Sequence, residues 1–134
     1  MRLVLDTNVL ISAFAARGLC YALFELCLEK HEIIISLHIL NELKANLEKK
    51  IKLPKKKIEE LVLFLRENSI LGKVKKLPQD ICRDIDDINI IGLAEKSNAD
   101  FIITGDRDLI ILKKYKNIPI LSPREFWEIN RKLK

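Results

Sequence analysis

Short apolar runs alternate with longer segments of helical periodicity along this chain. Four runs rich in isoleucine, valine and leucine predict buried strands, at residues 2–5, 33–36, 101–104 and 118–121. A less regular run at residues 70–77 predicts a fifth strand. Strands separated by helices are typical of a parallel sheet that helices cover on both faces. The expected fold class is therefore α/β, a three-layer αβα sandwich with a central parallel sheet of about five strands.

The segments between these strands carry the helical pattern. The stretch between the first two strands is long enough for two short helices, broken near Arg17–Gly18. Ser36 precedes an apolar stripe at helical spacing, so it predicts the cap of a helix that carries Glu42. Further helices are expected to begin after Pro54, at residues 84–87 and at Pro123 behind a Ser122 cap. No repeat, linker or low-complexity segment interrupts this pattern, and we expect one domain over residues 1–134.

Length and hydropathy narrow the class of protein. At 134 residues the chain has the size of a single domain that folds without a disulfide or a metal ion. No apolar run approaches the roughly 20 residues that cross a bilayer, so no membrane contact is expected. The opening "MRLVLD" reaches a carboxylate too early for a secretion signal. We therefore expect a cytoplasmic protein.

Cysteine and histidine give little sign of a soft metal centre. Cys20, Cys27 and Cys82 show no C-x-x-C spacing, which favours buried free thiols over a disulfide framework or a zinc site. His31 and His38 lack a matching pair of soft ligands. They are interpreted as ordinary surface or boundary histidines.

The net charge of +5 favours a polyanionic partner. Much of the excess lies in "KANLEKKIKLPKKK", residues 44–57. This segment fits a solvated helical face and a patch that follows the phosphates of a polyanion equally well. Few aromatic residues lie nearby to stack on bases, so no sequence-specific readout is expected from it. The candidate phosphate-binding residues are Lys49, Lys50, Lys52, Lys55, Lys56 and Lys57.

Acidic residues follow two of the predicted strands. The run "RLVL" leads directly into Asp6, and "FIIT" passes through Gly105 into Asp106. Ligands of an open parallel sheet bind in the crevice outside the carboxyl ends of its strands, where both acids are expected. Either acid taken alone could instead cap the helix that follows it.

A third acidic group opens the helix expected after residue 84. Asp87 shares a helix face with Ile90 and Ala94, so it would point toward the sheet. Asp86 also aligns with Ile90, and spacing alone does not choose between the two acids. Together with Asp84 they could also simply complement the helix dipole.

Convergence of these acids with Glu42 would need counter-charge. Two ionised carboxylates about 5 Å apart repel by roughly 3 kcal/mol at an effective dielectric near 20, so such a cluster binds cations or takes up protons. An all-oxygen donor set suits a hard cation such as Mg²⁺ or Mn²⁺. Thr7 and Asn8 offer neutral groups to orient a carboxylate or a water. Asn8 also argues against a haloacid-type phosphatase, which would carry aspartate there, and the glycine-free first turn argues against a dinucleotide-binding fold.

Five ordered segments span nearly the whole chain and carry recognisable motifs. They are "LVLDTNVLISA", "SLHILNELKANL", "DIDDINIIGLA", "FIITGDRDLI" and "IPILSPREFWEI". In this order they resemble the PIN-domain proteins, in particular VapC-like toxins of toxin-antitoxin systems. The resemblance implies a Mg²⁺- or Mn²⁺-dependent endoribonuclease with a five-stranded parallel sheet between helices. The catalytic and metal-binding acids that it implies are Asp6, Glu42, Asp87 and Asp106, with Thr7, Asn8, Asp84, Thr104 and Asp108 in support.

One motif departs from the family pattern. The family commonly has proline and asparagine where this chain has Ile85 and Ile88, so Asp84, Asp86 and Asp87 all stay candidates for the third acid. Counting back seven residues from an alanine, as the family pattern does, favours Asp87.

The resemblance also implies partners. These are an RNA substrate, a small antitoxin protein that covers the acidic groove, and a second copy of the chain in a homodimer. Phe126 and Trp127 could belong to such an interface, although packing of the last helix on the core is the simpler interpretation. The alternative function is a PIN-like module that binds RNA or protein without cutting it.

Overall fold

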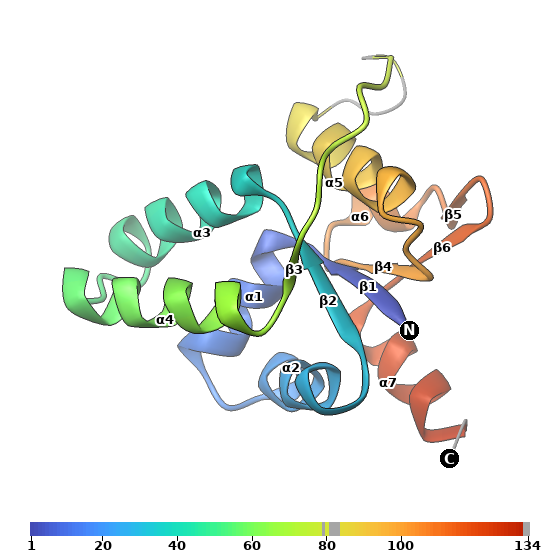
Figure 1. Cartoon of the computed structure of the whole chain (residues 1–134). Coiled ribbons are helices and arrows are strands. Elements are labelled where there is room, and N and C mark those ends of the chain that lie inside the picture. Colours follow the sequence, from blue (N-terminus) through green and yellow to red (C-terminus); the bar gives the residue numbers. More distant parts are fainter. Residues whose placement is uncertain (79, 81–83, 133–134) are drawn as a thin grey trace.

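A computed structural model describes residues 1–78, 80 and 84–132, so the predicted thiol of Cys82 lies outside the described residues. Within this part of the chain, six strands form one sheet in the order β3-β2-β1-β4-β6-β5 (Figure 1). The strands are β1 (Arg2–Leu5), β2 (Glu32–Ile35), β3 (Ile70–Leu71), β4 (Phe101–Ile103), β5 (Lys114–Tyr115) and β6 (Ile118–Leu121). The central strand β1 pairs in parallel with β2 and β4.

Five of these strands run parallel, and the predicted α/β class with a central sheet of about five parallel strands is confirmed. The additional strand β5 pairs antiparallel with β6 at the edge of the sheet. The predicted strand at residues 70–77 was too long. It ends at Leu71, after which the chain crosses the helix that follows and Lys75 N donates a 3.1 Å hydrogen bond to Gly92 O.

Seven helices lie within the described residues, close to where the pattern predicts them. They are α1 (Thr7–Ala15), α2 (Leu19–Lys30), α3 (Leu37–Lys49), α4 (Lys55–Glu67), α5 (Ile85–Lys96), α6 (Arg107–Ile110) and α7 (Pro123–Lys132). Ser36 caps α3 as predicted, because its Oγ accepts a 3.1 Å hydrogen bond from Ile39 N. Ser122 and Glu125 form a reciprocal capping box at the start of α7. The short helix α6 was not predicted.

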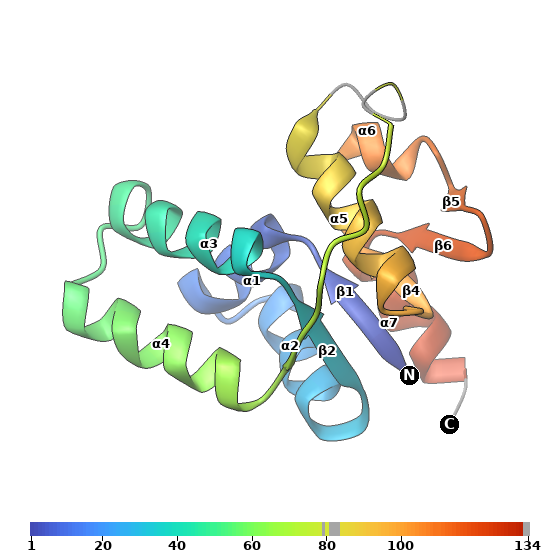
Figure 2. The same cartoon turned by 45° about the horizontal axis from the view of Figure 1, so that its top comes forward.

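Helices cover both faces of the sheet (Figures 1 and 2). Helix α5 packs across β1, β2 and β4 on one face, and α2 and α7 pack on the other, beside α1. Helices α3 and α4 form a hairpin that extends to one side of the sheet. Strands β1 and β2 are buried on both faces, which explains why they appear in the sequence as continuous apolar runs rather than alternating ones.

The core also contains the large C-terminal aromatic residues. Phe126 is fully buried, and Trp127 packs against the core, as the simpler interpretation predicted. Cys27 is a buried free thiol whose pKa burial raises to about 12, and Cys20 is half-buried and free. No single helix of the described chain is long and apolar enough to cross a membrane; α1 and α2 meet that criterion only as a pair, with a 106° bend between them.

Candidate active site at the carboxyl ends of the strands

Asp6 follows β1 at the carboxyl edge of the sheet. Its backbone N donates a 2.9 Å hydrogen bond to Ile103 O, which continues the pairing with β4. The side chain is buried, and its Oδ2 accepts a 2.7 Å hydrogen bond from Thr104 Oγ1. Burial raises the pKa of Asp6, whereas the hydrogen bond from Thr104 lowers it. Within the described chain this carboxylate makes no capping bond to α1, so a helix cap does not explain it.

Thr104 connects Asp6 with Asp106. The Thr104 side chain is fully buried, and its Oγ1 also accepts a 2.9 Å hydrogen bond from Asp106 N. The Oδ1 atom of Asp106 accepts a 2.9 Å hydrogen bond from Asp108 N and so caps α6. The cap interpretation of Asp106 is therefore correct, and it leaves the second carboxylate oxygen for another partner.

Asp87 lies in the first turn of α5 and joins the same group. One carboxylate oxygen from each of Asp87, Asp106 and Asp108 lies within 4.8 Å of the other two. Burial, and next the charge of Asp106, raise the pKa of Asp87 to about 7. The side chain is only 4% exposed, and Oδ2 has no hydrogen-bond partner among the described residues. An ionised carboxylate oxygen buried without a donor is costly, so this group either takes up a proton, as the raised pKa of Asp87 indicates, or binds a cation, and its all-oxygen donor set suits a divalent ion.

The three candidate acids of α5 separate in space. Asp84 is exposed and caps the helix by accepting a 2.9 Å hydrogen bond from Asp86 N. Asp86 turns toward α3, where it contacts His38. Asp87 alone of the three lies with Asp106, so the geometry favours Asp87 for the site on β1 and β4.

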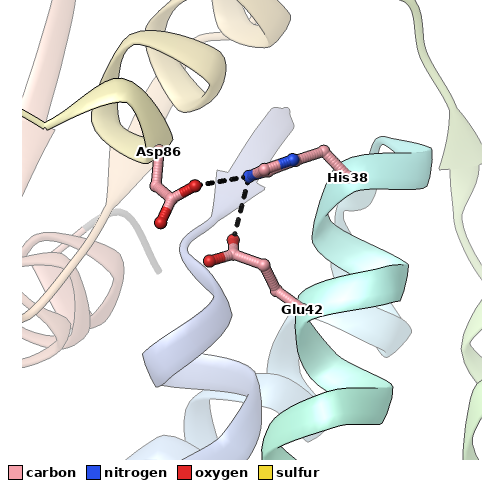
Figure 3. Close-up of side chains that lie close together, drawn as sticks. All are labelled: His38, Glu42 and Asp86. Atoms are coloured by element: carbon pink, nitrogen blue, oxygen red, sulfur yellow. Dashed lines mark hydrogen bonds and ion pairs between the residues drawn. The ribbon is translucent and has the colours of Figure 1, made fainter.

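Glu42 belongs to a second group, on the side of α3 (Figure 3). Its Oε1 accepts a 3.1 Å hydrogen bond from Thr7 Oγ1. The Nε2 atom of His38 lies 3.4 Å from Glu42 Oε1 and 2.7 Å from Asp86 Oδ1. Burial and the charge of Asp86 raise the pKa of Glu42. The predicted acids thus form two groups, linked where Thr7 follows Asp6 and where Asp86 precedes Asp87.

Sequence reasoning missed His38. The half-buried ring points at both carboxylates of the second group rather than into solvent (Figure 3). A usable signal was its position four residues before Glu42, since residues so spaced share one face of a helix.

Other predicted residues lie apart from the two groups. Asn8 is exposed in the first turn of α1, and no side-chain hydrogen bond joins it to the acids within the described residues. The six candidate lysines are exposed at the turn between α3 and α4. That turn is at the opposite end of α3 from His38, so the structure does not bring these lysines to the acids.

A PIN domain family model matches residues 2–108, a span that contains both acidic groups. The chain belongs to the PIN domain family. No match was found among curated proteins.

Solved structures share the fold at low sequence identity. One is VapBC2 from Rickettsia felis, bound to a DNA fragment from its promoter, with a TM-score of 0.67, 20% identity and coverage of 91% of this chain and 98% of that chain. Another is FitAcB from Neisseria gonorrhoeae, with a TM-score of 0.57, 16% identity and the same coverage of both chains. At these identities the likeness is one of fold.

Proposed function

We propose that this protein is a divalent-metal-dependent endoribonuclease and the toxin component of a toxin-antitoxin pair. The observation that carries the proposal is the buried Asp87 Oδ2, which has no hydrogen-bond partner among the described residues and lies in a group with Asp106 and Asp108. Membership of the PIN domain family and the fold shared with VapBC2 support it. Because the proposed substrate is cellular RNA, we place the protein in the cytoplasm.

Asp6, Asp87 and Asp106 would hold a Mg²⁺ or Mn²⁺ ion, with Glu42 close by. When bound, such an ion lowers the pKa of a water ligand and offsets the charge that develops on the phosphate. Thr104 fixes Asp6 through its hydroxyl and fixes Asp106 through the backbone, so both carboxylates are oriented in advance. Thr7 orients Glu42 in the same way.

The proposed RNA substrate also needs contacts outside the acids. A polyanion approaching two acidic groups needs positive charge elsewhere on the protein. The exposed lysines of the α3–α4 turn supply it, and they would attract the RNA backbone without reading its sequence.

Exposed apolar side chains next to the acids favour a protein partner. Leu37 precedes His38 and is 60% exposed, Ile85 precedes Asp86 and is 66% exposed, and Ile111 follows α6 and is 72% exposed. Large exposed apolar residues beside a functional site are typical of an interaction surface. We propose that a small antitoxin covers these three residues and that the chain forms a homodimer.

Cleavage of labelled RNA by the purified protein tests the function. Activity is expected with Mg²⁺ or Mn²⁺ and none with a chelator. Asp87→Asn and Asp6→Asn are each expected to lose roughly 100-fold or more, since even residues that only support a metal site typically cost 10- to 100-fold. Glu128→Gln, an exposed acid on α7, is the matched control and should keep full activity.

The same variants separate the enzyme from an inert PIN-like module. Full metal-dependent activity in both Asp87→Asn and Asp6→Asn would contradict the proposed site. RNA binding without cleavage, together with no Mn²⁺ uptake in calorimetry, would favour the binding module.

A further inference from the structure

Two lysine-rich segments meet on α5, the helix that carries one of the candidate acids. Residues 70–78 contain three lysines and no acidic residue, and so do residues 109–121. Lys75 of the first segment and Lys116 of the second both donate to Glu95 Oε1, Lys75 at 3.0 Å. One carboxylate therefore joins the two segments into a single surface. We call it the α5 basic surface, and its members are Lys73, Lys75, Lys76, Lys113, Lys114 and Lys116.

The first segment runs along α5 toward the acids. A Cβ at Gly72 would lie 2.7 Å from Ser97 Oγ, at the end of α5, whereas Lys75 N donates its hydrogen bond to Gly92 O. The chain therefore advances toward the start of α5 as it crosses the helix (Figure 2). Its lysines line a path that leads to the first turn, where Asp87 lies.

The second segment begins one short helix away from Asp106. Helix α6 follows Asp106 and has four residues, so it rises by about 6 Å. Lys113 N donates a 2.9 Å hydrogen bond to Ile110 O at the end of α6, and Lys113 O accepts a 2.8 Å hydrogen bond from Ile120 N of β6. These bonds hold β5 beside α6 at the edge of the sheet (Figures 1 and 2). The second segment is therefore fixed close to the candidate acids.

Most of the charge on this surface is not neutralised by the protein. Hydrogen bonds from Lys116 and Lys75 lower the pKa of Glu95 to about 2, so this acid stays ionised and offsets one of the two lysine charges. Uncompensated positive charge on an exposed surface attracts polyanions. Such charge is carried by the four lysines that are exposed and have no ion pair among the described residues, which are Lys73, Lys76, Lys113 and Lys114.

The backbone of the second segment adds an independent sign that the lysine charges matter. Lys116 opens the two-residue turn between β5 and β6 and has a φ of 53°, and Lys113 has a φ of 64°. Such positive φ values favour glycine or asparagine, and other residues adopt them at a cost in conformational energy. Turn conformation therefore does not explain the choice of lysine, whereas a requirement for positive charge does.

We propose that the α5 basic surface binds the backbone of single-stranded RNA and guides it to the candidate acids. Phosphates are complementary in charge to exposed lysines, which bind them without reading the sequence. A flexible single strand bends toward Asp6 and Asp87, which are buried, whereas a duplex is too stiff to do so. The lysines of the α3–α4 turn lack this path, because they lie away from the acids. The inference rests on the proposed function for its substrate, but RNA binding is measured without cleavage.

Binding of a fluorescein-labelled oligouridylate of about ten nucleotides tests the surface. With a chelator present to prevent cleavage, fluorescence anisotropy at several salt concentrations gives the affinity and its salt dependence. We call the triple variant Lys73→Gln, Lys76→Gln and Lys114→Gln the α5 variant. It should bind roughly 10-fold or more weakly than the wild type, with a slope of log K against log salt that is shallower by about 0.7 for each phosphate that is no longer neutralised.

Helix α7 provides the matched control, because it packs on the opposite face of the sheet from α5. Replacing its exposed Arg124, Arg131 and Lys132 by glutamine changes the net charge by the same amount. This control should bind the oligouridylate with nearly the wild-type slope. Equal losses in the two variants, or no loss in the α5 variant, overturn the proposal.

Labelled polyglutamate of similar length tests an acidic protein as the partner instead of RNA. We expect the wild type to bind the oligouridylate more tightly than polyglutamate. Polyglutamate binding that is lost in the α5 variant, together with unchanged oligouridylate binding, overturns the proposal.

Cleavage kinetics test whether the surface leads RNA to the acids. The α5 variant should show a raised KM and an unchanged kcat, because the lysines bind RNA equally in the ground state and the transition state. Weaker RNA binding with an unchanged KM overturns the guiding role.

The two proposals fail separately. A wild type that binds RNA through these lysines and cuts none keeps the surface and removes the nuclease. Cleavage of RNA with equal RNA binding in the wild type and the α5 variant keeps the nuclease and removes the surface.

Discussion

Thr104 donates a 2.7 Å hydrogen bond to Asp6 Oδ2, joining the residues that follow two neighbouring strands. The register of the sheet explains this contact, because Leu5 pairs with Ile103 and the next residue of each strand is therefore adjacent. The same hydroxyl accepts the Asp106 N–H. One buried side chain thus sets the relative positions of two acids, and it does so through strand pairing rather than through a loop.

Replacing Thr104 with valine should loosen the positions of Asp6 and Asp106 in the proposed metal site while nearly keeping the side-chain shape. Thr104→Val removes the donor to Asp6 and leaves Asp106 N without its acceptor. We expect Mn²⁺ affinity to fall roughly 10-fold and the free energy of unfolding to fall by about 1–3 kcal/mol. Calorimetric titration and urea denaturation measure the two effects. Thr104→Ser keeps the hydroxyl and should stay close to the wild type in affinity, and a valine variant with wild-type affinity would show that this hydrogen bond has no role.

The parts of the fold that the sequence predicted are those with a strong local signal. Strands β1, β2 and β4 are short, apolar and buried on both faces, and Ser36 and Ser122 make the capping bonds that their positions predicted. Strand β5 was missed because it has two residues, both at an edge, and no apolar run marks it. Strand β3 was overextended because the apolar residues after Leu71 pack across α5 instead.

The sequence predicted which residue types form the candidate site, but only partly which of these residues lie together. Strand ends placed Asp6 and Asp106 together, since parallel strands end at one edge. The choice of Asp87 over Asp86 depends on how α5 is rotated against the sheet, which helical spacing does not specify. The i,i+4 spacing pairs His38 with Glu42 on one helix face, but its contact with Asp86 depends on the approach of α3 to α5, a tertiary contact without a local sequence signal.

Asp87 should make the metal-free protein less stable as the pH rises. Burial, with the charge of Asp106, raises its pKa to about 7, against about 4 in an unfolded chain. Below pH 4 both states hold the proton and no pH effect is expected. Between pH 4 and 7 the folded state binds a proton that the unfolded state has lost, so the free energy of unfolding falls as the pH rises, and above pH 7 this loss is complete.

Asp87→Asn removes this titration. With a chelator present at pH 8, we expect the variant to be more stable than the wild type by about 1–3 kcal/mol, the usual cost of a buried polar group without a partner. Urea denaturation from pH 4 to 8 measures the difference, and Glu128→Gln should follow the wild-type curve. Parallel curves for Asp87→Asn and the wild type would contradict the assigned pKa. Added Mn²⁺ should stabilise the wild type more than the variant.

Gly92 allows the chain after β3 to cross α5 closely. A Cβ at this position would lie 2.4 Å from Lys75 O and 2.8 Å from Val74 Cγ1, and backbone cannot move aside cheaply. Gly92→Ala gains about 1 kcal/mol of helix propensity, but the cost of the clash exceeds this gain. We therefore expect the free energy of unfolding, measured by urea denaturation, to fall by about 1–3 kcal/mol. Gly18→Ala is the control, because a Cβ at Gly18 has no neighbouring atom within 4 Å and should change the free energy of unfolding little. A more stable Gly92→Ala variant would show that this crossing adjusts freely.

The lysines at the start of α4 should contribute to RNA binding and not to folding. Lys55, Lys56 and Lys57 occupy its first turn, which contains no acidic residue, so they oppose the helix dipole. Their replacement by glutamine should leave the free energy of unfolding unchanged or slightly higher.

Salt dependence separates a phosphate-binding patch from a solvated helix face at these lysines. If all three neutralise phosphates, the triple glutamine variant should bind single-stranded RNA more weakly, with a slope of log K against log salt that is shallower by about 0.7 for each phosphate that is no longer neutralised. Replacing the exposed Arg124, Arg131 and Lys132 of α7 by glutamine changes the net charge by the same amount and serves as the control. Because a general charge effect would reduce binding in both variants equally, identical slopes would favour the solvated face. A shallower slope confined to the α4 variant would place the RNA backbone along the α3–α4 turn.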